Sequence, residues 1–518
     1  MLTLSRKRRR ISILLVLPAI VLGLWTEAVS AHSFVKSTDP KAGSTVEKAP
    51  TAVLIRFNEP VELAFGGIEV LDPDGSRIQV GEADYASEDQ TAIRIGLASE
   101  LANGRYTVEW KIVAADGHPR EGQFRFRLDQ PAPESPSPTP SESPEETHAS
   151  PEAEMGGAPP GSGGDDAEGA GGLPSVLLGI TRWVLFASLL LLVGLGVFAL
   201  AVWRPAAGAR PPEVDDTFYR RWRPIVTWAW VGAVVASLAS LAFEGAVAAD
   251  VPLGEALSGE VLGALLGTRF GVVTVARLGL LVVVGAVLLC ARASRARRVL
   301  VYAEPRRSVG AAAAVTPMPW GSLSAWAVLG LGLLVTIGLT GHAGTTSPVI
   351  LGMTADLAHL AGASLWLSGL IGLVFLALPS TRGLADGERV SVLAPVVARF
   401  SSLAVWCVAL IVVSGVIRGW MEIRTLAGLT GYAYGLTLLI KLGVVVPLVV
   451  LGAVNNRWTK PRIRRAAHDA TLTDSGTAAL RTLNRIVLVE VVLAAVVLVV
   501  TAVLVNQSPP AGEMGGGH

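Results

Sequence analysis

The chain has 518 residues, of which 51% are hydrophobic and only 16% are charged, whereas soluble domains usually carry about 25% charged residues. This composition excludes an ordinary soluble enzyme and a highly charged disordered protein. The 43 basic and 42 acidic residues nearly cancel, so we expect no nucleic acid as a partner, because no basic excess is left to neutralise phosphates. Two cysteines are too few for a disulfide framework or a four-thiolate zinc site.

Residues 1–31 have the parts of a secretory signal peptide. Residues 6–10 are all basic, an apolar run follows, and Val29 and Ala31 suit cleavage after Ala31. Cleavage would make His32 the first residue of the mature chain. A retained N-terminal anchor is the alternative.

Residues 32–128 alternate apolar and polar side chains, most clearly from Tyr106 to Ile112 and from Phe124 to Leu128. Period-two alternation is typical of half-buried strands. Turn sequences such as DPDG and ADGHP separate these stretches. The pattern predicts an all-β sandwich outside the membrane.

Three residues of this region have the chemistry of a metal site. A mature N-terminal His32 would offer an α-amine and an imidazole, and Asp116 and His118 lie two residues apart, so that they point the same way on an extended segment. Nitrogen and oxygen donors of this kind suit Cu(II), whereas thioethers select Cu(I), and the region contains no methionine. The alternative is that Asp116 and His118 only form a turn.

The region also resembles the periplasmic copper-binding CopC family. The resemblance rests on HSFVKSTDPKAGSTV at 32–46, IRFNEPVE at 55–62 and WKIVAADGHPREGQFRF at 110–126. It implies an immunoglobulin-like sandwich with a cupric site made by the N-terminal histidine and by the Asp and His of the DGH motif. These positions are His32, Asp116 and His118 in this chain.

Residues 129–172 contain ten acidic residues and no Lys or Arg, and they are rich in Pro, Ser and Gly. Such a composition cannot form a core and predicts a disordered linker.

Residues 173–506 predict a polytopic α-helical membrane domain, followed by an external tail at 507–518. Stretches long enough to span a bilayer lie near 177–203, 224–246, 270–290, 322–341, 355–378, 402–420, 433–453 and 486–505. Alternate loops carry 21 basic residues against 2 in the others, Arg269 and Arg424. The positive-inside rule then predicts a plasma-membrane protein whose N-terminal domain and C-terminus are extracytoplasmic. An external amphipathic helix is expected within 251–269.

Ionisable groups inside a membrane are costly and often functional. Asp356 and His359 share one face of the fifth span, Met353 precedes them by a turn, and His342 ends the fourth span. Together they predict a copper pathway at the outer mouth of the helices. The alternative is a helix cap, a loop histidine and a packed polar contact.

Arg277, Arg418, Lys441 and Glu490 are expected to form helix-packing ion pairs or to snorkel, and an ion path that includes Lys441 and Glu490 is the alternative. This half of the chain resembles the CopD family of membrane copper proteins. The resemblance rests on GHAG at 341–344, Asp356 and His359, WLSG at 366–369, ARFS at 398–401 and the later stretches 432–441 and 451–457. It implies copper uptake or homeostasis.

The sequence therefore predicts a copper importer in which the outer domain captures Cu(II) and the membrane residues receive it. Two alternatives stay open. One is a membrane-anchored copper buffer, resistance or sensing protein without transport, and the other is a membrane redox protein with His342 and His359 on one haem. We expect copper ions and the lipid bilayer as partners, no nucleotide and no enzymatic activity, and the oligomeric state is not predicted.

Overall fold

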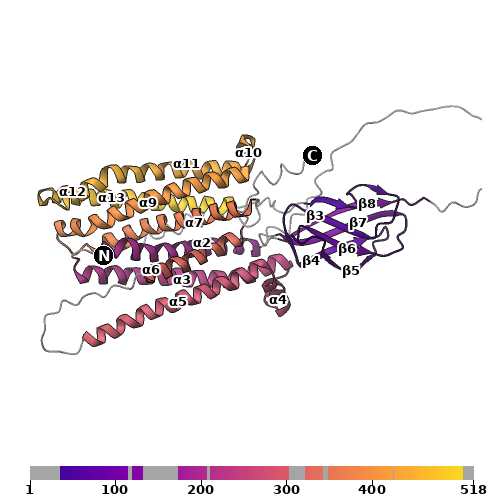
Figure 1. Ribbon diagram of the computed structural model, residues 1–518, viewed down its shortest axis with the longest axis horizontal. Coiled ribbons are helices and arrows are strands. Elements are labelled where there is room, and N and C mark those ends of the chain that lie inside the picture. The colour runs from indigo at the N-terminus through magenta and orange to yellow at the C-terminus, as the bar shows by residue number, and fades with distance from the viewer. Residues whose placement is uncertain are drawn as a thin grey trace, which may run out of the picture.

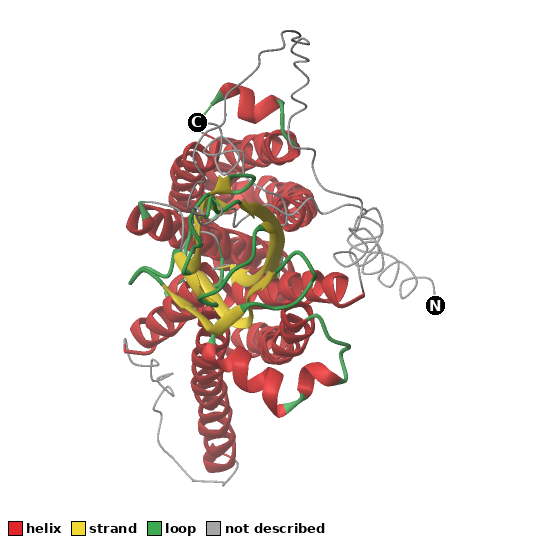
Figure 2. Ribbon diagram, turned by 90° about the vertical axis from the view of Figure 1, so that its right-hand side faces the viewer, coloured by secondary structure: helices red, strands yellow, loops and turns green. Residues whose placement is uncertain are grey.

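The computed structural model describes residues 35–114, 119–131, 173–206, 210–302, 321–341, 348–423 and 425–505. A β-sandwich lies at one end of a long bundle of helices (Figure 1). Figure 2 views the molecule from the sandwich end, with the strands in front of the helices. The predicted fold class, an N-terminal β-sandwich and a C-terminal helical region, is confirmed.

The sandwich consists of two four-stranded sheets, with strand orders β1-β3-β6-β5 and β2-β8-β7-β4. All strand pairs within them are antiparallel except β2 with β8. The strands are β1 (Val35–Asp39), β2 (Thr45–Val46), β3 (Ala52–Phe57), β4 (Val61–Leu71), β5 (Gln79–Tyr85), β6 (Ala92–Leu97), β7 (Gly104–Ala114) and β8 (Pro119–Leu128).

The apolar face predicted for β7 and β8 forms the core between the two sheets. Tyr106, Val108 and Ile112 are at most 1% exposed. The ring of Tyr106 stacks on that of Phe126 with centroids 5.2 Å apart. Burial of apolar side chains in such a core is the main force that stabilises a domain of this kind.

Strand pairing brings five strand ends to the same end of the sandwich. Val35 at the start of β1 pairs with Phe57 at the end of β3. A short turn leads to Val61 at the start of β4, which pairs with Ala114 at the end of β7. β8 then begins at Pro119 beside Val113. The residues on either side of segment 115–118 therefore lie at the same end as the start of β1.

Long apolar helices follow where the hydropathy predicts spans. Seven of the helices in the described ranges are long and apolar enough to cross a membrane, and Leu323–Leu339, in the region of the predicted fourth span, is a shorter apolar helix. The main helices are α2 (Leu173–Val197), α3 (Pro212–Ala249), α4 (Gly259–Gly267), α5 (Arg269–Tyr302), α6 (Gly321–Leu339), α7 (Val349–Ile371), α9 (Asp386–Ile423), α11 (Ala433–Val454) and α13 (Thr473–Val505).

Short helices and π-helical turns complete the bundle, and α4 lies within the stretch where an amphipathic helix is predicted. The π-helical turns extend α2, α7 and α11. These elements are η1 (Phe198–Trp203), η2 (Glu255–Leu257), η4 (Gly372–Ala377), α8 (Leu378–Ser380), α10 (Leu426–Thr430), η5 (Asn455–Thr459), α12 (Lys460–Ala466) and η6 (Ala470–Leu472).

Helix α2 lies inside the bundle and packs against α3, α6 and α7. The hydroxyls of Ser364 and Ser368 on α7 both donate to the carbonyl of Leu190 on α2, at 2.8 and 3.1 Å. Gly369 then lets the ring of Phe400 on α9 approach α7, because a Cβ on Gly369 would lie 2.0 Å from Phe400 Cε2. The WLSG and ARFS motifs are thus helix-packing contacts.

Gly369→Ala is expected to lower the free energy of unfolding by about 1–3 kcal/mol, the usual cost of overpacking a filled core. Gly419→Ala on α9 is the matched control, since a Cβ there meets no atom within 4 Å. The midpoints of thermal unfolding in detergent compare the two variants. Equal midpoints would contradict the close contact of α7 and α9.

A buried arginine on α5 joins the start of that helix to the end of α6. Arg277 lies two turns from the start of α5, and its Nε and Nη2 donate to Oγ1 and the carbonyl oxygen of Thr336, each at 2.9 Å. Thr336 is in the last turn of α6. The end of α6 and the start of α7 therefore lie at the same end of the bundle as the start of α5.

Candidate functional site

Four predicted ligands lie outside the described residues: His32, Asp116, His118 and His342. Their flanking residues are described. β1 begins three residues after His32, and β7 and β8 end and begin on either side of the segment that holds Asp116 and His118. Strand pairing brings these flanking residues to one end of the sandwich. The assignment of the ligands themselves stays a prediction.

Met353 and Asp356, both on the first turns of α7, face the end of α6. A Cβ atom on Gly338 would lie 3.0 Å from Asp356 Oδ2 and 3.7 Å from Met353 Sδ. Because Gly338 has no side chain, the carboxylate and the thioether share the space beside it. Two of the predicted membrane residues are therefore brought together.

His359 lies one turn further along α7 and faces α9 instead. Its Nδ1 is 3.2 Å from the carbonyl oxygen of Ile411 and 3.2 Å from Ser414 Oγ. A carbonyl oxygen only accepts, so the neutral ring carries its proton on Nδ1 and leaves a lone pair on Nε2. This is the arrangement of a histidine oriented by its second nitrogen for metal binding.

An ion-pair network joins Asp356 to α9 and α11. Arg418 Nη1 lies 3.6 Å from Asp356 Oδ1, and Arg418 Nη2 also donates to Glu422 Oε1. The hydroxyl of Tyr434 on α11 donates to Glu422 Oε2. Arg418 is thus a tethered cation held between two carboxylates. An ion that binds Asp356 must compete with it.

Lys441 and Glu490 have different surroundings. Lys441, on α11, interacts electrostatically with Glu422, Arg418 and Asp356, so it belongs to the same network. Glu490 on α13 is 3% exposed and accepts a 3.3 Å hydrogen bond from Asn455, the first residue of η5 just beyond the end of α11. The structure therefore separates Lys441 from Glu490.

Sequence reasoning missed Glu422 and Tyr434. Glu422 stands four residues after Arg418 on one helix, and this spacing is a signal of an ion pair that sequence alone could have given. Tyr434 gave no such signal, because its partner lies on another helix. Within the described ranges, no group of three or more His, Cys, Asp or Glu side chains is placed to hold a metal ion.

Comparison with protein families finds three matches along the chain. Residues 35–129 match the CopC domain, residues 173–304 match the copper resistance protein D-like N-terminal domain, and residues 394–504 match copper resistance protein D. The two halves of the chain therefore match different copper protein families.

The chain is also similar to individual proteins. The copper transport protein CutJ of Bacillus subtilis (strain 168) is 26% identical over 471 residues, covering 90% of this chain and 74% of that protein. Protein YobA of Escherichia coli (strain K12) is 33% identical over 112 residues, covering 22% of this chain and 90% of that protein. The crystal structure of CopC from Methylosinus trichosporium OB3b is 32% identical and covers 19% of this chain and 95% of that one, with a TM-score of 0.18.

Proposed function

Because the chain belongs to the copper resistance proteins that join a CopC domain and a CopD domain in one polypeptide, we propose that it captures Cu(II) outside the cell and imports copper across the plasma membrane. The observation that supports this best is that the residues beside the predicted copper ligands lie at the end of the sandwich that faces the helices. The strand ends next to His32 and to segment 115–118 lie at the end of the sandwich that contacts the bundle.

Capture uses the α-amine and imidazole of His32 together with Asp116 and His118. This set of nitrogen and oxygen donors suits cupric ion. The linker at 129–172 keeps the sandwich tied to the bundle and so keeps its local concentration at the membrane high. The basic loops favour an orientation in which the sandwich is outside and the opposite end of the bundle is cytoplasmic.

Reception uses the residues at the start of α7. Met353 and Asp356 beside Gly338, and the free Nε2 of His359, offer thioether, carboxylate and imidazole ligands within about two turns of one helix. The fourth candidate is His342. Arg418 neutralises Asp356 when copper is absent and keeps the pair of carboxylates from repelling each other.

The full chain in proteoliposomes is expected to accumulate radioactive copper supplied as Cu(II) on the sandwich side. Empty vesicles give the background rate, and vesicles with an imposed membrane potential test whether a field speeds the uptake. Cupric binding is measured on the same preparation. Intact binding with no accumulation above background would reduce the protein to a membrane-anchored copper buffer.

A further inference from the structure

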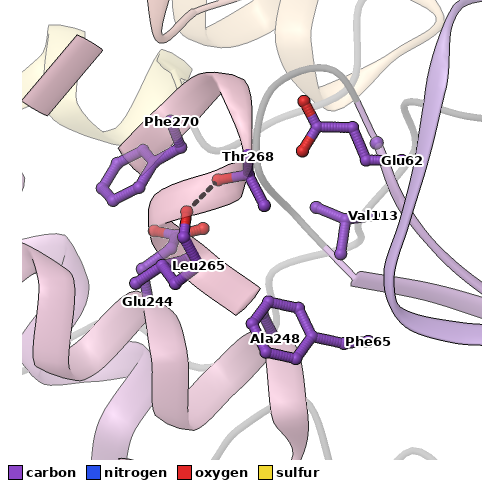
Figure 3. A pocket seen from close by; sticks show the side chains of 9 residues that line it. Glu62, Phe65, Val113, Glu244, Ala248, Leu265, Thr268 and Phe270 are labelled. Carbon is purple, nitrogen blue, oxygen red and sulfur yellow. Dashed lines mark hydrogen bonds between the residues drawn. The ribbon is translucent and has the colours of Figure 1, made fainter. Parts of the chain in front are cut away.

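The sandwich and the bundle enclose a small pocket where they meet. It is lined by β4 and the end of β7 on one side, and by the end of α3 and the α4–α5 corner on the other (Figure 3). Its cavity volume is about 10 Å³, which is room for one water molecule or one ion. Ala114, two residues before Asp116 in the chain, is part of its wall.

One wall carries Glu62, the second residue of β4. Its Oε1 accepts a 2.9 Å hydrogen bond from the backbone N–H of Arg269, the first residue of α5. A carboxylate is favoured at a helix N-terminus, so Glu62 anchors the sandwich to the bundle. Burial nevertheless raises the pKa of Glu62 and outweighs the lowering by Arg269. The charged form of Glu62 therefore lacks part of the stabilisation it has in water.

The other wall carries Glu244, near the end of α3. Its side chain is 1% exposed, and Oε2 forms a 2.9 Å ion pair with Arg182. The second oxygen, Oε1, is buried and has no hydrogen-bond partner among the described residues. An unsatisfied buried carboxylate oxygen is costly. Thr268 also lines the pocket; its hydroxyl donates to the carbonyl of Leu265 at 2.6 Å and accepts a 3.1 Å hydrogen bond from the backbone N–H of Gly271 (Figure 3).

We propose that this pocket is a transit site for a divalent copper ion, held by the carboxylates of Glu62 and Glu244, on its way from the sandwich to the bundle. This proposal rests on the proposed import function and adds a binding site between the capture residues of the sandwich and the receiving residues of α7. One carboxylate comes from each domain, and a cation would satisfy the free oxygen of Glu244 and relieve the desolvated charge of Glu62.

The chemistry of the pocket suits passage rather than storage. Its donors are all oxygens, which hold copper less strongly than sets that contain imidazole. A site on a conduction path must bind well enough to admit the ion and weakly enough to release it. Ions would therefore leave the imidazole-containing capture site for this pocket only transiently, and move on to His359.

Glu62→Gln and Glu244→Gln test the proposal in the full chain. Each amide keeps an oxygen that can accept the existing bond, from Arg269 N–H between sandwich and bundle or from Arg182 between α2 and α3, while the charge of the carboxylate is lost. The expected result is a copper uptake rate lower by at least about 10-fold, because these carboxylates would bind the ion directly and even groups that only support a ligand cost about 10- to 100-fold, with cupric affinity of the outer domain unchanged. Glu260→Gln on the exposed face of α4 is the control for surface charge and should take up copper at the wild-type rate.

A binding readout separates this proposal from the import function. In the full chain carrying Asp116→Ala and His118→Ala, electron paramagnetic resonance with Cu(II) alone should show a weak oxygen-coordinated signal that Glu244→Gln removes. This signal would show that the pocket binds Cu(II) even if the wild-type chain transported no copper. Absence of this signal, or Gln variants that transport as fast as Glu260→Gln, would overturn the transit site.

Discussion

Addition of one residue ahead of His32 in the mature chain is expected to lower the affinity for cupric ion by more than about 100-fold, which exceeds the 10- to 100-fold typical of groups that only support a ligand. In the predicted site the α-amine and the imidazole of His32 close one six-membered chelate ring on the metal. An added residue converts the amine into an amide, so the chelate is lost even though the imidazole remains.

Titration of the full chain with Cu(II) against a competing chelator measures this change. A single glycine inserted into the linker at 129–172 lengthens the chain equally but leaves His32 first, and it should bind like the wild type. The amine must lose its proton to bind copper, so the wild-type affinity should fall as the pH is lowered, and this dependence should be weaker in the extended chain. An extended chain that binds as tightly as the control would remove the amine from the site.

The β-sandwich could be predicted because the alternation of apolar and polar residues follows directly from burial of one face of each strand. A strand with one buried face alternates, and Tyr106, Val108 and Ile112 are buried as their spacing predicts. The sequence does not predict which strands pair. The meeting of the β1, β7 and β8 ends depends on the register of β3 and β4, which hydropathy does not encode.

The membrane helices were predicted in position but not in length. The hydropathy places the second, sixth and eighth spans at 224–246, 402–420 and 486–505, whereas α3, α9 and α13 begin at Pro212, Asp386 and Thr473. Hydropathy marks only the part that suits lipid. The backbone hydrogen bonds continue into polar turns beyond it, because an α-helix satisfies its own backbone groups in either environment.

The contacts within the candidate sites were even less predictable from the sequence than the helix lengths. A spacing of three residues correctly puts Asp356 and His359 on α7, but it does not show that Asp356 turns to Gly338 and Arg418 while His359 turns to Ile411. These partners come from two other helices, α6 and α9. The contact of Glu62 with Arg269 joins residues 207 apart in the chain and depends on how two domains meet. Periodicity within one element carries no information about such contacts.

Replacement of His359 by alanine is expected to reduce copper uptake to the rate of empty vesicles while cupric binding by the outer domain stays at its wild-type affinity. The imidazole offers the one nitrogen ligand among the described residues predicted for the membrane pathway, and its loss leaves a carboxylate and a thioether. The measurement is uptake into proteoliposomes beside a cupric titration of the same protein. Ser402→Ala, an exposed position on α9, is the control and should transport normally.

Loss of uptake in His359→Ala would report a missing ligand rather than a damaged fold, because the polar groups beside the ring keep other partners. Ser414 Oγ already donates to the carbonyl of Leu410 at 2.6 Å, so removing the ring leaves no stranded hydroxyl. Ser414→Ala sharpens the distinction. It removes one of the two groups that face Nδ1 but leaves the carbonyl of Ile411 to orient the ring. A ligand role for Nε2 therefore predicts a partial loss in Ser414→Ala and a complete loss in His359→Ala, whereas normal uptake in His359→Ala would exclude the ring from the pathway.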